Sequence, residues 1–151
     1  MSWALEEYVE DALVDYLTRE VTDGTMNFYP GWTAEDVIKY PCAIVHAGVS
    51  RNIGDSVFNG AREIDVQIAV MCNANESTTQ TARERNRTAR DAVMTALAQD
   101  ELQDDLNAMN PKGIVFSRAM IGDITRSMES DQRVFVSEIN VETIAAPEVV
   151  K

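Results

Sequence analysis

The chain has 151 residues, of which 45% are hydrophobic and 25% charged, and its formal net charge is −12 at pH 7. This length predicts one domain over residues 1–151, long enough to bury a core without disulfide or metal staples. The excess of acids disfavours a general grip on nucleic-acid phosphates or on an anionic membrane, because both need clustered Lys and Arg. The first residues lack the pattern of a secretory signal, so we expect synthesis and retention in a reducing cytoplasm.

The N-terminal segment, residues 2–21, has the apolar spacing of one helix face. The acids Glu10, Asp11 and Asp15 fall off this apolar stripe, so we expect them on a solvated, acidic face. The side chains expected on the buried face are Leu5, Tyr8, Val9, Ala12, Leu13, Tyr16 and Leu17.

A connection from Asp23 to Pro41 follows the first helix. Its aromatic segment from Phe28 to Trp32 is too apolar for a solvated linker. We expect it to pack across the edge of the core or to form an interface patch.

Two extended segments then surround a polar interval. Residues 41–50 are apolar at nearly every position, as in a strand covered on both faces. Residues 62–72 alternate between apolar and polar side chains, as in a strand with one buried face. The simplest arrangement is an antiparallel hairpin with a long mobile tip over residues 51–60, and connections of this length tend to be functional.

The second half of the chain predicts a broken helix and two more strands. The helical pattern over 78–98 changes phase near Gln99, where Asp100 and Gln103 predict a capping box for a second, short helix. Residues 114–121 and 133–144 read as strands, separated by a second polar loop over 122–132. Together the elements predict an α+β fold: a small, mostly antiparallel four-stranded sheet with a long N-terminal helix and a broken second helix packed against it.

Residues with catalytic or metal-binding chemistry are sparse. The single histidine, His46, lies in an apolar run, where a core or sheet-surface role is the better interpretation. Cys42 and Cys72 lack metal-ligand spacing, and we expect both to be small core residues rather than a disulfide or reactive thiols. We therefore predict no catalytic residue, no metal ligand and no cofactor. A basic stripe is formed by Arg83, Arg87 and Arg90, which either pairs with local acids or meets an acidic surface of a neighbour.

The order of elements resembles that of the tail terminator, or tail-completion, proteins of long-tailed bacteriophages. The resemblance covers nearly the whole chain as a pattern without an invariant motif. The segments that carry it are WALEEYVEDALVDYL, YPCAIVHAG, REIDVQIAVMC, ARERNRTARDAVMTALAQDELQDDL and RVFVSEINVETIAAP.

The resemblance implies a structural virion protein that is not an enzyme. It implies a hexameric ring at the tail–neck junction, assembled in the host cytoplasm, which caps the major tail tube protein and joins it to the head–tail connector or stopper. DNA would pass through this ring without specific binding, and no membrane is involved. The loops 51–60 and 122–132 would contact the tube or border the channel, and the residues expected in the first of these are Arg51, Asn52, Ile53, Asp55, Phe58 and Asn59.

Symmetric rings need two different patches that meet between neighbours. We expect the basic stripe of Arg83, Arg87 and Arg90 to meet the acidic first helix of the next subunit, at Glu10 and Asp11. Two alternatives stay open: another neck or head–tail joining protein of a phage, and a small enzyme or ligand-binding domain that uses His46 or a cysteine.

Overall fold

A computed structural model of the protein describes residues 5–21, 26–52, 61–73, 79–99, 101–109, 113–129 and 134–147. Within these residues the chain forms α-helices, one short 3-10 helix and the strands of a single sheet. In chain order the elements are α1 (Leu5–Glu20), β1 (Asn27–Pro30), η1 (Glu35–Val37), β2 (Cys42–Asn52), β3 (Arg62–Asn73), α2 (Thr79–Leu97), α3 (Leu102–Ala108), β4 (Ile114–Glu129) and β5 (Val134–Pro147).

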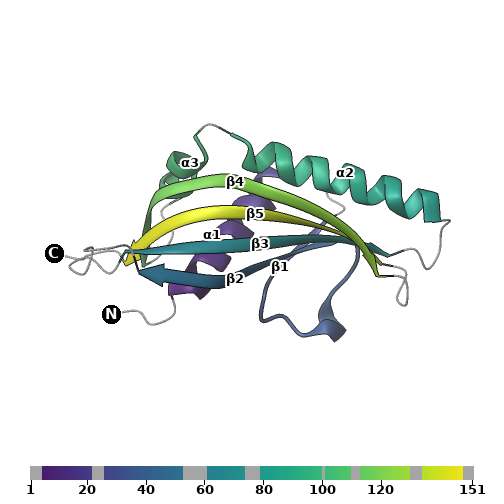
Figure 1. The fold of residues 1–151 in the computed structure, drawn as a ribbon, viewed down its shortest axis with the longest axis horizontal. Helices are drawn as coiled ribbons and strands as arrows, with labels where there is room; N and C mark the ends of the chain where they lie inside the picture. The colour runs from purple at the N-terminus through teal and green to yellow at the C-terminus, as the bar shows by residue number, and fades with distance from the viewer. Residues whose placement is uncertain are drawn as a thin grey trace.

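The described strands form a five-stranded sheet in the order β1-β2-β3-β5-β4 (Figure 1). β1 runs parallel to β2, and the other neighbouring pairs are antiparallel, including the expected β2–β3 hairpin. The predicted four-stranded sheet is therefore wrong. Residues 27–30, which the sequence places in a connection, form an additional strand at one edge. Their pattern is too short to show a period, and Pro30 at the end has no N–H for the ladder.

The interval 122–132, predicted as a polar loop, continues β4 as far as Glu129. The prediction of a second polar loop is therefore wrong for residues 122–129, while residues 130–132 of that loop lie outside the described chain. β-Bulges explain the error, because each one interrupts the alternation of side chains that marks a strand in the sequence. The register of β4 against β5 shifts between Phe116 and Arg118 and again between Ile121 and Ile124.

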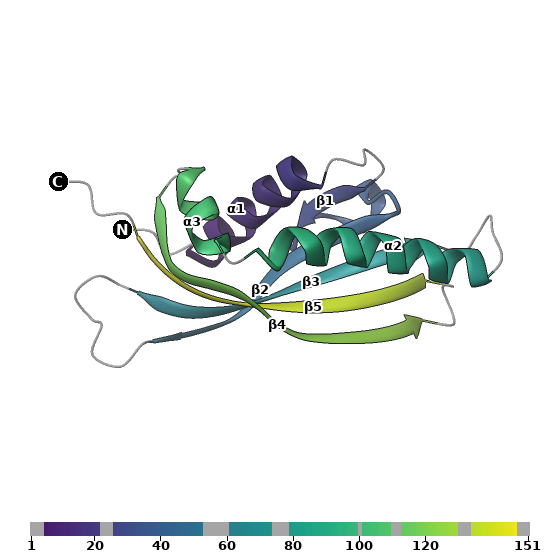
Figure 2. The ribbon, with the colours of Figure 1, turned by 90° about the horizontal axis from the view of Figure 1, so that it is seen from above.

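All three described α-helices lie on one face of the sheet (Figure 2). The core fills the space between the two layers. Alternate side chains of β3 point into it, as predicted: Ile64, Val66, Ile68, Val70 and Cys72 are all buried. β2 is not covered on both faces as its sequence predicts, since the side chain of His46 is 61% exposed.

α1 packs on the sheet through the predicted stripe, except that Tyr8 is exposed and Glu10 is buried. The Tyr16 hydroxyl donates a buried 2.7 Å hydrogen bond to the carbonyl of Ala96, which ties α1 to the end of α2. Tyr8, expected in the core, is 39% exposed and lies beside Gly113 at the start of β4. Glu10, expected on the solvated face, is 5% exposed because it bonds to the edge of the sheet.

The predicted break in the second helix is confirmed, since α2 and α3 are separated by residues 98–101. The predicted capping box is wrong. The residue at the N-cap is Glu101, not Asp100, and no side chain there bonds to the first turn. Gln103 instead donates a 3.3 Å hydrogen bond to the carbonyl of Phe116, so it links α3 to β4.

Candidate partner interfaces

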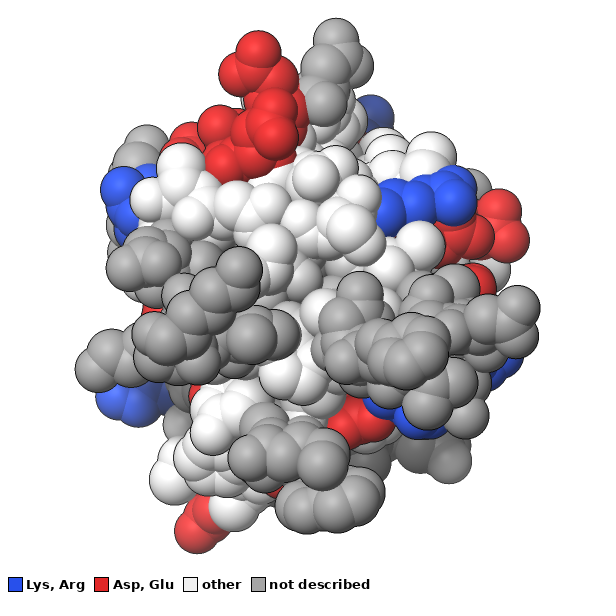
Figure 3. Space-filling view, turned by 90° about the vertical axis from the view of Figure 1, so that its left-hand side faces the viewer, with Lys and Arg blue, Asp and Glu red and all other residues white. Residues whose placement is uncertain are grey.

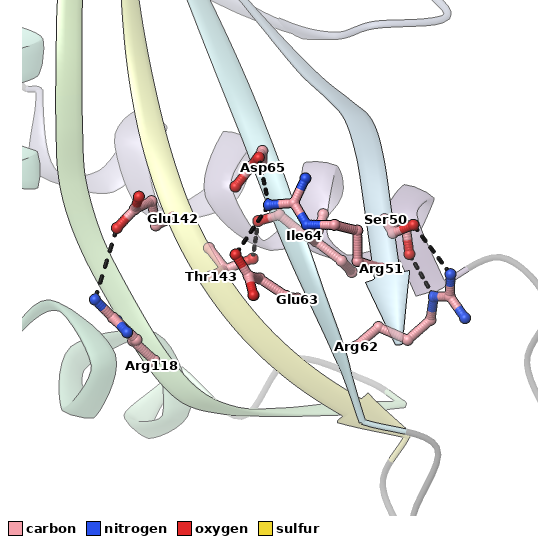
Figure 4. A network of polar contacts seen from close by, with 9 residues as sticks. All are labelled: Ser50, Arg51, Arg62, Glu63, Ile64, Asp65, Arg118, Glu142 and Thr143. Carbon is pink, nitrogen blue, oxygen red and sulfur yellow. Dashed lines mark hydrogen bonds and ion pairs between the residues drawn. The ribbon is translucent and has the colours of Figure 1, made fainter. Parts of the chain in front are cut away.

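The end of the β2–β3 hairpin is held together by polar side chains (Figure 4). Arg51 reaches across to β3, where its guanidinium lies 2.9 Å from Glu63 and 2.9 Å from Asp65. These bonds favour the charged form and raise the pKa of Arg51. On β3, Arg62 donates to the hydroxyl and the carbonyl of Ser50. Both strands are thus fixed to each other close to where the described hairpin ends.

Arg51 forms the base of the predicted tube-contacting loop. Asn52 is the last residue of β2 and lies opposite Arg62 in the ladder. The hairpin end projects away from the helices (Figure 2), so a partner can reach it without displacing the core. The other residues predicted for this site lie outside the described chain: Ile53, Asp55, Phe58 and Asn59.

The arginines of α2 differ from one another in exposure. Arg87 is exposed, whereas the side chain of Arg90 is only 17% exposed and its Nε lies 3.8 Å from Asp91. Arg83 belongs to the first half of α2, and its side chain is outside the described part of the chain. Arg87 is therefore the described member of the predicted basic stripe that is best placed to meet a neighbour.

A buried amide fixes the orientation of α2 on the sheet. The Asn86 side chain donates a 2.9 Å hydrogen bond to the carbonyl of Val70 and accepts a 2.6 Å bond from the hydroxyl of Ser137. Both bonds are buried, and breaking them would leave polar groups unsatisfied in the core. Because Asn86 anchors the inner face of the helix, the next residue, Arg87, is held on an exposed face.

An acidic stripe follows the exposed side of α1. Glu7, Asp11 and Asp15, which we call the α1 acidic stripe, stand four residues apart and are all exposed. Like charges at this spacing repel each other. Partial burial, Asp15 and Glu7 together raise the pKa of Asp11. No ion pair between described residues involves this stripe, so its charge is not balanced within the described part of the subunit.

Glu10 lies apart from the α1 acidic stripe and forms a hydrogen bond with the sheet instead. Its carboxylate accepts a 2.8 Å hydrogen bond from the N–H of Ala47. β1 pairs with β2 only as far as Val45, so Glu10 replaces a strand partner just beyond the end of β1. Since this carboxylate is used within the subunit, the acidic surface available to a neighbour is the α1 acidic stripe, including Asp11.

His46 sits on the same edge of β2. Its Nδ1 lies 3.6 Å from the Glu10 carboxylate. The ring passes so close to Gly31 that a β-carbon there would stand 2.6 Å from Nδ1. These contacts fit the interpretation of His46 as a histidine on the surface of the sheet.

Both cysteines are free and buried, as predicted. Burial raises the pKa of Cys42 to about 12 and that of Cys72 to about 11. Because the thiolate is the reactive form, neither thiol is activated at neutral pH. Among the described residues, no group of three or more His, Cys, Asp or Glu side chains is placed to hold a metal ion.

On the faces drawn in Figures 3 and 4, basic side chains stand apart from one another and do not form a continuous track. On the open face of the sheet, Arg118 lies 3.6 Å from Glu142 (Figure 4), and Arg51 has acidic partners of its own. At the end of the molecule shown in Figure 3, acidic atoms gather at the upper rim and basic atoms lie in small separate groups. No helix within the described ranges is both long and apolar enough to cross a membrane.

The aromatic segment of the first connection divides between the core and the surface. Phe28 packs partly buried against the core, whereas Trp32 is 72% exposed. β4 also exposes large apolar side chains, among them Val115 and Met120. Their exposure is not predictable from the sequence, because apolar residues in a strand normally predict burial. Only the position of β4 at the edge of the sheet distinguishes them, and the order of strands is not visible in the sequence.

Comparison with known proteins identifies the fold. The chain is similar to a chain in the virion of a native gene transfer agent particle, with a TM-score of 0.62 and 11% sequence identity. The alignment covers 96% of this chain and 99% of the other. At this identity the similarity shows a shared fold. No protein-family model matches the chain, and no curated protein matches it.

Proposed function

We propose that this chain is a structural protein of a virion, and that it forms a ring which caps a tail tube and joins it to the head. The observation that carries the proposal is the fold shared, over nearly the full length of both chains, with a component of a gene transfer agent virion. The sequence resemblance to phage tail terminators supports the finer assignment to the tail–neck junction, with a tube protein and a head–tail connector as partners. No catalytic step is part of this function.

The hairpin formed by β2 and β3 is the proposed contact with the tube. It projects from the body of the subunit, and the ion pairs of Arg51 with Glu63 and Asp65 stiffen its base. A stiff base reduces the conformational entropy lost when residues 53–60 bind a partner. The net charge of −12 suits a ring through which DNA passes, because an acidic wall repels phosphates rather than holding them.

The charged contact between neighbours pairs the exposed Arg87 of one subunit with the α1 acidic stripe of the next. Each exposed pair contributes only about 0.2–1 kcal/mol and is screened by salt. This contact therefore sets the register of the ring, and most of its affinity must come from apolar side chains. Reversing Arg87 to Glu should weaken assembly at low salt, and Asp11→Lys in the same chain should partly restore it.

The role in the virion is tested by removing the coding sequence from the genetic element that carries it and examining the particles by electron microscopy. The proposal predicts heads and tails that remain separate, and joined particles when the chain is supplied in trans. A chain with residues 53–60 shortened to an Asn-Gly turn should fold and form rings, yet fail to join the two parts. Complete particles made without the chain would contradict the proposal. Antibody labelling at a position away from the tail–neck junction would favour another joining protein.

A further inference from the structure

Apart from Tyr8 on α1, the large apolar side chains exposed on the described surface gather at two opposite edges of the sheet. The connection after β1 exposes Trp32 at 72%, Val37 at 54% and Tyr40 at 40%, and we call these the β1-edge patch. The far edge, on β4, exposes three more at 40–48%, which we call the β4-edge patch: Val115, Met120 and Ile124. Figure 1 places β4 along the top of the sheet and the connection after β1 at the bottom.

The β1-edge patch is displayed on a scaffold that is already ordered. The N–H of Lys39 donates a 3.1 Å hydrogen bond to the hydroxyl of Tyr29. The Asn27 side chain donates to the carbonyls of Lys39 and Pro41, at 3.2 and 3.4 Å. A segment held in this way loses little conformational entropy on binding. An exposed Trp on such a segment has the chemistry of an interface anchor, because Trp and Tyr are enriched among binding hot spots.

The β4-edge patch offers apolar groups on both faces of an edge strand. Met120 lies opposite Glu142, on the open face of the sheet, whereas Ile124 lies opposite the buried Ile139, on the face that carries the helices. The Arg118 guanidinium contacts the Met120 sulfur at 2.9 Å. A guanidinium beside a thioether suits an aromatic ring, since both groups pack favourably against one.

We propose that the β1-edge patch of one subunit docks on the β4-edge patch of the next copy of this chain. The two patches differ in composition and lie at opposite edges, so their contact is heterologous, the kind of contact from which closed rings are built when the rotation between neighbours closes. An isologous dimer would instead require one patch to be complementary to itself. The inference rests on the proposed function because it assumes the ring. It names the apolar contact that such a ring needs, since its charged pairs are too weak to hold it together alone.

The first test measures the mass of the particle in solution by light scattering over a range of protein concentrations. Trp32→Ala should keep the far-UV circular dichroism of the wild type and weaken association by about thirtyfold or more, the usual effect of truncating a hot-spot side chain. Met120→Ala should also weaken association. Gln67→Ala, at an exposed position of the central strand β3, is the matched control and should associate like the wild type.

The second test maps the contact by oxidative cross-linking between two separately purified variants, Trp32→Cys and Met120→Cys. Their mixture should give a disulfide-linked dimer, whereas each variant alone, and Trp32→Cys mixed with Gln67→Cys, should not. The natural cysteines are buried, so they should not form cross-links between native chains. If Trp32→Ala fails to fold, the cross-linking result alone decides.

The outcomes separate this contact from the ring itself. A wild-type ring that Trp32→Ala leaves intact, or a Trp32→Cys variant that cross-links to itself, overturns the contact and leaves the proposed function standing. A wild-type chain that stays monomeric at every concentration overturns the ring as well.

Discussion

Replacing Asp11 by Asn should stabilise the isolated subunit. Asp11 stands four residues from both Glu7 and Asp15 on the exposed side of α1. Each like-charge pair at this spacing costs a helix about 0.2–0.5 kcal/mol, so removing both should add about 0.4–1 kcal/mol to the free energy of unfolding at low salt. The same substitution should weaken assembly, because the α1 acidic stripe is the proposed partner of Arg87 in the next subunit.

The stability gained by Asp11→Asn should depend on pH, in a direction set by the pKa of Asp11. The pKa of Asp11 is raised by burial and by its acidic neighbours, so the folded subunit binds this proton at a higher pH than the unfolded chain does. The charged carboxylate therefore destabilises the fold at neutral pH, and this destabilisation is lost as the pH falls through the raised value. The gain from Asp11→Asn should be full at pH 7 and absent below the unfolded pKa of Asp11.

The assay is urea unfolding followed by circular dichroism, with Trp32→Asp present in every chain so that assembly adds nothing to stability. Glu84→Gln is the matched control, because Glu84 precedes Arg87 by three residues on α2 and its removal should not stabilise. A less stable Asp11→Asn chain would refute the electrostatic reasoning. An equal gain at pH 7 and pH 3 would refute it too.

Three further predictions concern the interior and the edges of the sheet. Cys42→Ala together with Cys72→Ala should cost about 1–2 kcal/mol for each change through lost buried volume and leave assembly intact; thiol titration of the native wild type should show neither cysteine reacting before unfolding. Glu10→Ala should cost about 1–3 kcal/mol, because it leaves the N–H of Ala47 without its buried acceptor, and hydrogen exchange at that amide should accelerate. Asn107→Ala removes hydrogen bonds of 2.8 and 2.9 Å to the outer edge of β4; it should cost about 1–3 kcal/mol, and an unchanged urea midpoint would show that this edge needs no cap.

Elements with a sustained period were predictable from the sequence. The buried face of β3 follows from strict alternation, and the break between α2 and α3 follows from a change of helical phase. The burial of Cys42 and Cys72 follows from the apolar runs around them. In each case the local pattern and the tertiary contacts favour the same structure.

Features that depend on long-range pairing were not predictable. β1 is too short for a pattern and gains its structure by pairing with β2. β4 looks like a loop where its bulges break the alternation. The helical stripe predicts a buried Tyr8 and an exposed Glu10, and the structure shows the reverse. Glu10 is buried because it bonds to the N–H of Ala47 on β2, a contact between distant parts of the chain. The exposure of Val115 and Met120 on β4 depends on the order of strands in the sheet, which the sequence does not reveal. For Trp32 the sequence left both packing on the core and an interface patch open.

In the proposed assembly, identical subunits of this chain close into a ring through unlike edges. Electron microscopy of the purified wild-type chain, with averaging of single particles, tests it most directly. We expect closed rings with a central opening, and a ring of six subunits of 16.8 kDa has a mass of about 101 kDa. Each subunit in them should place its β1 edge against β4 of its neighbour. Two-fold dimers with like edges facing each other, or monomers at every concentration, would contradict it.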